Sequence, residues 1–224
     1  MGSTRLPGKV LADLGGRPLL EQLLRRLAPS TRLTQLVVAT TKLPEDDAVA
    51  ALAARGGVSC YRGSVDDVLD RYFQAAREHR ADVVVRLTGD NPLVDGSFVD
   101  QSVEAYLERR PDVDYLDTGS SKSYPVGLSV EVIAMEALAQ AWKEAREPAD
   151  REHVTRFIRN RGNRFHIHSL AGKRDDSDLR WTVDRPEDLT SVRLVFDALD
   201  LDRHLLGYEQ IVAAVRADPG LRSQ

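Results

Sequence analysis

The first nine residues combine fixed positive charge with hydroxyl groups and flexible backbone. The residue types that bind anions in this loop are Ser3, Thr4, Arg5, Gly8 and Lys9. An amphipathic stretch over residues 18–27 follows and predicts a helix. Backbone N–H groups near a helix start, together with arginine and lysine, can bind a polyphosphate. The alternative is an ordinary solvated basic loop, which composition alone favours.

Two aspartates follow runs of residues that predict strands. Asp90 comes after the run Asp82–Leu87 in a glycine-containing turn, and Asp184 follows the run Leu179–Val183 and precedes a helix that begins at a proline. Ligands of α/β proteins gather beyond the carboxyl ends of strands. Mg²⁺ typically uses one or two protein carboxylates besides phosphate oxygens and water. Each aspartate could instead have a structural role, in a turn or at a helix N-cap.

Short β-rich runs alternate with helical patterns, which predicts an α/β fold with a doubly wound, mainly parallel sheet. We expect strands at Gln35–Thr40, Val58–Tyr61, Asp82–Leu87, Asp114–Asp117, Ser129–Ile133, Phe165–Leu170 and Leu179–Val183. We expect helices at Asp46–Arg55, Asp66–His79, Gly96–Arg109, Met135–Arg146, Asp150–Arg161, Pro186–Leu199 and Tyr208–Ala217. No repeat or linker divides the chain, so residues 1–224 are expected to form a single domain.

Composition restricts the function classes. A chain of 224 residues can bury a sizeable core, and its net charge of −4 provides no basic surface for nucleic acid. The single cysteine, Cys60, excludes an internal disulfide and suits a reducing compartment. No run approaches the roughly 20 apolar residues of a membrane span, and no signal-peptide pattern is present. We therefore expect a cytoplasmic protein that binds neither nucleic acid nor membrane.

Six motifs, in the same order, resemble those of a known family. They are STRLPGKVLADLGGRPL, YRGSVDDVLDRY, RLTGDNP, YPVGLSVEV, REHVT and VDRPEDL. They closely resemble the cytidylyltransferase family named after spore coat polysaccharide biosynthesis protein F and, more broadly, the CMP-sugar synthetases of the CMP-KDO and acylneuraminate type. The resemblance covers residues 1 to about 196. It implies a Rossmann-like fold of the nucleotide-diphospho-sugar transferase kind.

The resemblance also implies a reaction. A hydroxyl of a sugar or sugar acid would attack the α-phosphate of CTP, forming a CMP-sugar for surface polysaccharide or glycoconjugate biosynthesis and releasing pyrophosphate. Lys9 and Arg5 would hold the triphosphate, and Mg²⁺ on Asp90 and Asp184 would offset the developing charge. Lys9, Arg5 and Asp90 are thus the expected catalytic residues. No strong general base is evident, and the metal could activate the hydroxyl instead.

Further binding residues follow from the same resemblance. The expected nucleotide-binding residues are Ser3, Thr4, Gly8, Gly63, Ser64 and Arg71, and the expected acceptor-binding residues are Tyr124, Glu131 and His153. Capping of the following helix is an alternative role for Ser64, and a structural hydrogen bond is an alternative for His153. An aspartate of the family's acceptor-side motif is Ser129 in this chain, which leaves the acceptor's identity open.

The resemblance includes a strand that this sequence does not show. In the family, a hydrophobic strand and an arginine precede the residues that match Met1 and Gly2. We therefore expect the chain as written to lack its first strand, which would lie in the middle of the sheet. Two other function classes remain open: a non-catalytic or truncated paralogue, and a nucleotide-sugar-dependent glycosyltransferase. The PGK loop, and the absence of an Asp-x-Asp pair after a buried strand, argue against the second. A homodimer is compatible with the resemblance.

Overall fold

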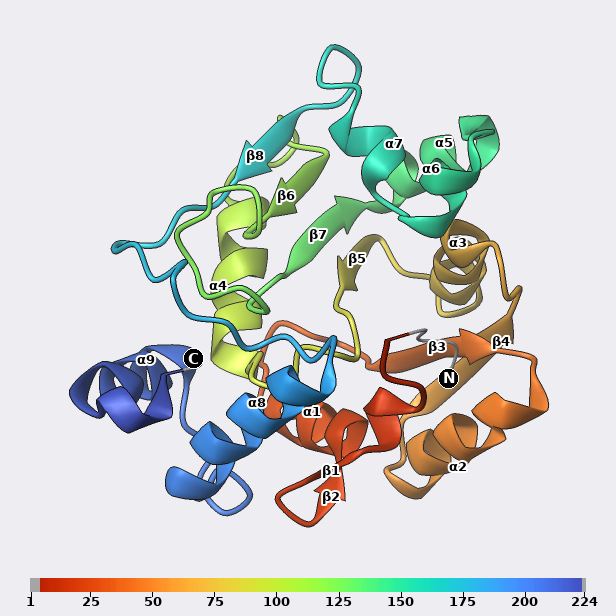
Figure 1. The fold of residues 1–224 in the computed structure, drawn as a ribbon. Coiled ribbons are helices and arrows are strands. Elements are labelled where there is room, and N and C mark those ends of the chain that lie inside the picture. The colour runs from red at the N-terminus through yellow and green to blue at the C-terminus, as the bar shows by residue number, and fades with distance from the viewer. Residues whose placement is uncertain (1–4, 223–224) are drawn as a thin grey trace.

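A computed structural model gives the fold of the protein and describes residues 5–222 (Figure 1). Its strands are β1 (Asp13–Leu14), β2 (Arg17–Pro18), β3 (Val37–Thr41), β4 (Ser59–Gly63), β5 (Val83–Arg86), β6 (Tyr115–Asp117), β7 (Glu131–Ala134) and β8 (Ile167–Ser169). Its α-helices are α1 (Leu19–Leu27), α2 (Asp47–Arg55), α3 (Val68–Glu78), α4 (Gly96–Leu107), α5 (Met135–Glu144), α6 (Pro148–Glu152), α7 (Arg156–Arg159), α8 (Pro186–Ala198) and α9 (Tyr208–Ala217). Single-turn 3₁₀ helices lie at Lys9–Leu11, Pro44–Asp46 and Pro219–Leu221.

The strands form a small hairpin, a parallel pair and a four-stranded sheet. β1 and β2 make the antiparallel hairpin, and β3 runs parallel to β4. The larger sheet has the order β5-β7-β6-β8, in which β7 is antiparallel to both neighbours. The α/β class is confirmed, but the pairing is mixed rather than mainly parallel. Asp117 at the end of β6 lies opposite Glu131 at the start of β7. The segment 118–130 therefore begins and ends at the same end of the sheet, and β7 runs antiparallel to β6.

The sheet is interrupted between β3 and β5. Within residues 5–222, β3 pairs only with β4 and β5 only with β7. The position between them, where the sequence analysis places the first strand of the family, holds no strand of the described residues. The apolar runs Val37–Ala39 and Val83–Val85 are half-buried, although their composition is typical of strands buried on both faces.

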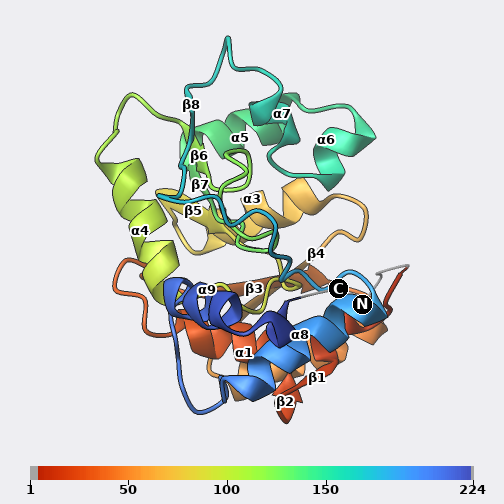
Figure 2. The same cartoon turned by 60° about the vertical axis from the view of Figure 1, so that its left-hand side comes forward.

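Helices pack around these strands. α2 and α3 pack against β3 and β4 and lie on either side of the pair in the view of Figure 1. α4 packs against β6 and β7, and α5 packs against β7. Figure 2 shows α1 and α8 gathered at one end of the molecule and α5, α6 and α7 at the other. Buried apolar side chains from Leu14 to Leu221 form one continuous core. The expected single domain is consistent with this core and stays a prediction.

Two expected elements differ in the structure. The helix expected at Asp150–Arg161 is divided into α6 and α7, because Val154 between them has a φ of 47°. A β-branched residue rarely adopts this left-handed conformation, and it ends the helical turn. The strand expected at Leu179–Val183 is reduced to one bridge, between Arg180 and Val126. Within the described part of the chain, no helix combines the length and the apolar character needed to cross a membrane.

Asp202 connects the turn after α8 to helix α1. Its Oδ1 accepts hydrogen bonds from Arg17 Nε at 3.0 Å, from Gln22 Nε2 at 3.1 Å and from Arg25. The hydrogen bond from Gln22, with those from Arg17 and Arg25, lowers the pKa of Asp202 to about 2. The carboxylate is therefore ionised in the folded protein at neutral pH and holds the turn against α1.

We predict that Asp202→Asn lowers the free energy of unfolding by about 1 kcal/mol at pH 7, the usual size for hydrogen bonds to a partly exposed charge. Because the folded-state pKa lies below the ordinary value of 3.8, this stabilisation is complete above about pH 4 and disappears as the pH falls toward 2. Urea unfolding of both proteins over this range measures it. Asp200→Asn is the matched control, since the ion pairs of Asp200 span 3.7 and 3.8 Å. A difference that stayed constant down to pH 3 would contradict the prediction.

Candidate functional site

A cluster of opposite charges joins the amino-terminal loop to the two aspartates. Lys9 Nζ lies 2.8 Å from Oδ2 of Asp90 and 3.1 Å from Oδ1 of Asp184. Arg5 approaches the same Oδ1 of Asp184 at 3.2 Å, and Arg180 donates to Oδ2 of Asp184 at 3.1 Å. The structure therefore brings together the expected catalytic residues and the expected metal ligands, although Lys9 and Asp184 are 175 positions apart.

The backbone at Gly8 turns the loop toward this cluster. Gly8 has a φ of 71°, a left-handed conformation that favours glycine, and its carbonyl accepts from Leu11 N at 2.8 Å. Val10, two residues after Gly8, packs on the turn that carries Asp90. A Cβ added to Gly89 would lie 3.3 Å from Val10. The two loops are therefore in direct contact, which places the Lys9 side chain beside Asp90.

The sequence analysis expects the loop to run straight into a helix. In the structure, other elements lie between the loop and α1. Lys9–Leu11 form a 3₁₀ turn, the hairpin β1–β2 follows, and α1 begins only at Leu19. The start of α1 nevertheless stays beside this turn, because the amide of Leu19 donates to the carbonyl of Ala12 at 2.9 Å. Ser3 and Thr4 lie outside the described residues, so their nucleotide-binding roles stay predictions.

Backbone contacts bring Asp184 to Asp90. The amide of Val183 donates to the carbonyl of Asp90 at 2.8 Å, and the amide of Trp181 donates to the carbonyl of Val126 at 2.6 Å. Gly127 makes this approach possible, because its φ is 109° and an added Cβ would lie 2.5 Å from the backbone nitrogen of Thr182. Three segments distant in sequence are thus interlocked at the carboxyl edge of the sheet.

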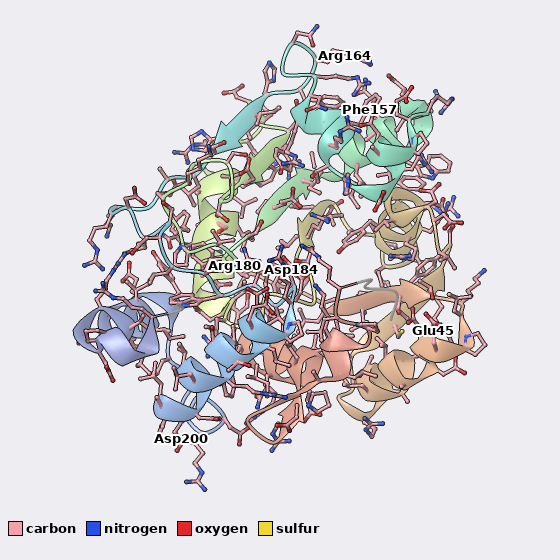
Figure 3. The ribbon with its side chains drawn as sticks, viewed as in Figure 1. Glu45, Phe157, Arg164, Arg180, Asp184 and Asp200 are labelled. Carbon is pink, nitrogen blue, oxygen red and sulfur yellow. The ribbon has the colours of Figure 1, made fainter. Side chains whose placement is uncertain are left out.

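Asp188 supports Asp184 from the start of α8. It accepts hydrogen bonds from the backbone amides of Asp184 and Arg185, both at 2.9 Å, and from Arg180 Nε at 2.8 Å. Figure 3 shows Arg180 and Asp184 next to one another near the amino-terminal end of α8. The sequence analysis assigns no role to Arg180 or Asp188. The acidic residue three positions after the N-cap is a capping signal that predicts the second role, but no local pattern predicts the first.

The charges around Asp184 determine its protonation. Partial burial alone would raise the pKa of Asp184, but the hydrogen bond from Lys9 and the charges of Lys9, Arg5 and Arg180 hold it below its ordinary value. The side chains of Asp90 and Asp184 are 24% and 22% exposed, so a ligand can reach both. In residues 5–222 no three His, Cys, Asp or Glu side chains converge as metal ligands. Two carboxylates are nevertheless enough for Mg²⁺ when phosphate oxygens and water complete its shell.

The residues expected to line the nucleotide after β4 shape their own turn. A Cβ added to Gly63 would lie 2.7 Å from Cγ of Arg71, so only glycine fits beneath this side chain. Arg71 donates to the carbonyls of Ser64 at 2.6 Å and Val65 at 3.1 Å. Ser64 Oγ accepts from the amide of Asp67 at 3.1 Å. The N-cap of α3 is Asp67, whose side chain accepts from the amide of Asp70, so Ser64 stabilises the turn before the helix instead of capping it. Contact of these residues with a nucleotide stays a prediction.

Glu131, an expected acceptor-binding residue, lies in a buried polar network. Its Oε1 accepts from the hydroxyls of Tyr115 and Thr155, both at 2.6 Å, and Arg86 pairs with its Oε2. Burial alone would raise the pKa of Glu131, but the charge of Arg86 and these hydrogen bonds hold it below its ordinary value. The residue is only 5% exposed. Its observed function is to anchor β5, β6 and the α6–α7 connection to β7.

The other two expected acceptor residues lie apart from each other. Tyr124 is buried, with its ring 4.9 Å from that of Phe98 and 5.9 Å from that of Tyr208. Its side chain is therefore part of the core. His153 is exposed at the end of α6. The structure does not bring either residue into the Lys9 cluster, and their roles toward an acceptor stay predictions.

A further acidic residue that the sequence analysis does not select lies at the same sheet edge. Strand register places Arg86, Glu131, Asp117 and Ser169 in one row across the four-stranded sheet, and hence on one face. Asp117 is 3% exposed and accepts from Ser120 N at 2.5 Å and from Ser169 Oγ at 3.4 Å. Ser129 Oγ would lie 3.5 Å from a Cβ added to Gly119, in the next segment of chain. An acidic residue at the end of an apolar strand is a signal that could have pointed to Asp117.

The chain is similar to proteins of one family. The family model for cytidylyltransferases matches residues 1–210. The uncharacterized protein MJ1063 of Methanocaldococcus jannaschii is 41% identical over 208 residues, which cover 90% of this chain and 83% of that protein. Spore coat polysaccharide biosynthesis protein SpsF of Bacillus subtilis is 34% identical over 203 residues, 88% and 82% of the two chains. A solved structure of a cytidylyltransferase from Leptospira borgpetersenii has a TM-score of 0.94 and 30% identity, and the match covers 100% of this chain and 93% of that one.

We predict that Gly127→Ala destabilises the protein by about 3 kcal/mol or more, because the added methyl group meets backbone atoms that cannot move aside. Gly16→Ala is the matched control. Gly16 is also left-handed, with a φ of 80°, but nothing lies within 4 Å of its added Cβ, so only the conformational cost of about 1–2 kcal/mol applies. Urea unfolding measures both free energies. Equal costs would show that the close approach of residues 127 and 182 is not required.

Proposed function

Because the chain belongs to the cytidylyltransferase family, we propose that it transfers CMP from CTP to a hydroxyl of a sugar or sugar acid and releases pyrophosphate. The observation that carries the proposal is the Lys9 ammonium between the carboxylates of Asp90 and Asp184. A cation and two carboxylates lie within hydrogen-bond distance of one another, and groups of this kind support the transfer of a nucleotidyl group by positioning and by neutralising charge. The name of the Bacillus relative, a spore coat polysaccharide biosynthesis protein, supports a sugar acceptor and a role in surface polysaccharide formation.

Two cations of the amino-terminal loop are suited to hold the triphosphate. Lys9 is 13% exposed and Arg5 is 57% exposed, so Lys9 is the more firmly placed of the two. Arg5 can leave Asp184 at little cost, because an exposed ion pair contributes at most about 1 kcal/mol. The two residues would orient the phosphates and neutralise the charge that develops on the leaving pyrophosphate.

Asp90 and Asp184 are suited to hold Mg²⁺ together with the nucleotide. Both are partly accessible and face one cation, and their oxygens are the ligands that Mg²⁺ prefers. When bound, Mg²⁺ would supply charge neutralisation at the phosphate oxygens. Arg180 and Asp188 would keep the Asp184 carboxylate in place.

We predict that Asp90→Asn lowers pyrophosphate release from CTP about 100-fold or more while the protein stays folded, because the variant loses a charge needed at the phosphates. The assay supplies CTP, Mg²⁺ and a panel of sugars and sugar acids, and circular dichroism checks the fold. Asp112→Asn, at an exposed position between α4 and β6, is the matched control and should keep full activity. The proposal fails if wild-type protein transfers CMP to no member of the panel, or if Asp90→Asn turns over like wild type.

We also predict that Lys9→Ala weakens binding of CTP in the presence of Mg²⁺ by roughly 1.5–3 kcal/mol, the value of one hydrogen bond to a charged group. Calorimetric titration of the two proteins measures the difference. Lys122→Ala removes an exposed lysine in the segment 118–130 and serves as the control. Equal affinities of wild type and Lys9→Ala would make Lys9 a structural counterion only.

A further inference from the structure

Lys9 occupies the position between the carboxylates where a shared cation would bind. We propose that Lys9 and a divalent cation compete for Asp90 and Asp184, so that the protein without nucleotide binds the cation weakly and the triphosphate, by drawing Lys9 away, makes both carboxylates available. This inference rests on the proposed function and adds to it the order in which nucleotide and cation bind. The cation would bind well only together with the nucleotide.

The contacts of Lys9 leave little room for both cations. Its ammonium is within 2.8 and 3.1 Å of one oxygen on each carboxylate. A divalent cation held by these two carboxylates would compete with the ammonium for their oxygens, and the two positive charges would repel strongly because the Lys9 side chain is only 13% exposed. One of the two must therefore leave when the other binds.

Lys9 is the partner that can move. Its charge sits at the end of a flexible four-carbon chain with three rotatable donors. The aspartates have anchors besides Lys9. The backbone carbonyl of Asp90 accepts from Val183 N at 2.8 Å, which fixes the turn that carries the carboxylate. Oδ2 of Asp184 has a hydrogen bond from Arg180 at 3.1 Å, and Figure 3 shows these two residues side by side. When Lys9 moves to the phosphates, Oδ2 of Asp90 loses its observed cation and Oδ1 of Asp184 keeps only the exposed Arg5 nearby.

The exchange couples the two ligands in both directions. A nucleotide that removes Lys9 from the carboxylates raises the affinity for the divalent cation, and the cation must raise the affinity for the nucleotide by the same factor. Free divalent cation, in contrast, has to displace Lys9 without any new partner for the ammonium. Occupation of the site is thereby restricted to the state in which CTP is present.

The test measures Mn²⁺ binding to nucleotide-free protein by electron paramagnetic resonance of free Mn²⁺. Lys9→Met keeps the length of the side chain and removes the competing charge, and we expect it to bind Mn²⁺ roughly tenfold tighter or more, as loss of one charge-assisted contact predicts. Lys9→Arg retains the charge and should stay near wild type. Lys173→Met removes an exposed lysine far along the chain and should also leave Mn²⁺ affinity unchanged. Adding Asp184→Asn to Lys9→Met should abolish the gain.

Several results would overturn the inference. They are a folded Lys9→Met protein that binds Mn²⁺ no tighter than wild type, a gain of the same size in Lys173→Met, and a gain that survives Asp184→Asn. The measurement uses neither CTP nor an acceptor. Failure of the proposed function, seen as absent CTP binding or absent pyrophosphate release, is therefore recorded separately from failure of the exchange.

Discussion

The ammonium of Lys9 between two carboxylates is the interaction on which this site depends. It connects the loop at residues 5–11, the turn after β5 and the segment before α8. None of the three is held there by a regular sheet pairing, since Arg180 and Val126 make only an isolated bridge. Two partly buried carboxylates at close range would repel one another without a shared cation. The charge balance therefore holds the three segments together.

A second charge pair, which is more deeply buried, stabilises the four-stranded sheet. Arg86 and Glu131 lie opposite each other on β5 and β7, and the hydroxyls of Tyr115 and Thr155 complete the hydrogen bonds of the carboxylate. A buried charge is tolerated when it is paired and hydrogen-bonded. This network keeps β5 in register, and Asp90 follows β5 by four residues. The position of the Asp90 carboxylate thus depends on an ion pair that does not touch it.

Close backbone contacts connect the segments that carry these two charge clusters. Gly127 lies against Thr182, and Val183 is hydrogen-bonded to Asp90. Val154, in a left-handed conformation, ends α6 and leads the chain to Thr155, which contacts Glu131. Strained or close-packed backbone of this kind persists only where surrounding contacts support it. In this protein those contacts are the polar networks around Asp184 and Glu131.

The sequence by itself determined the α/β class and the family, because these depend on alternating strand and helix patterns and on the order of the motifs. It also predicted that Lys9, Asp90 and Asp184 belong to one site, but not that the lysine pairs with both carboxylates. It did not predict the mixed sheet, the division of the helix at Val154, or the half-buried state of β3 and β5. These features depend on which strands become neighbours. The core position of Tyr124 and the pairing of Lys9 with two carboxylates belong to the same group. Their partners come from segments distant in the sequence, and only the tertiary structure brings those partners together.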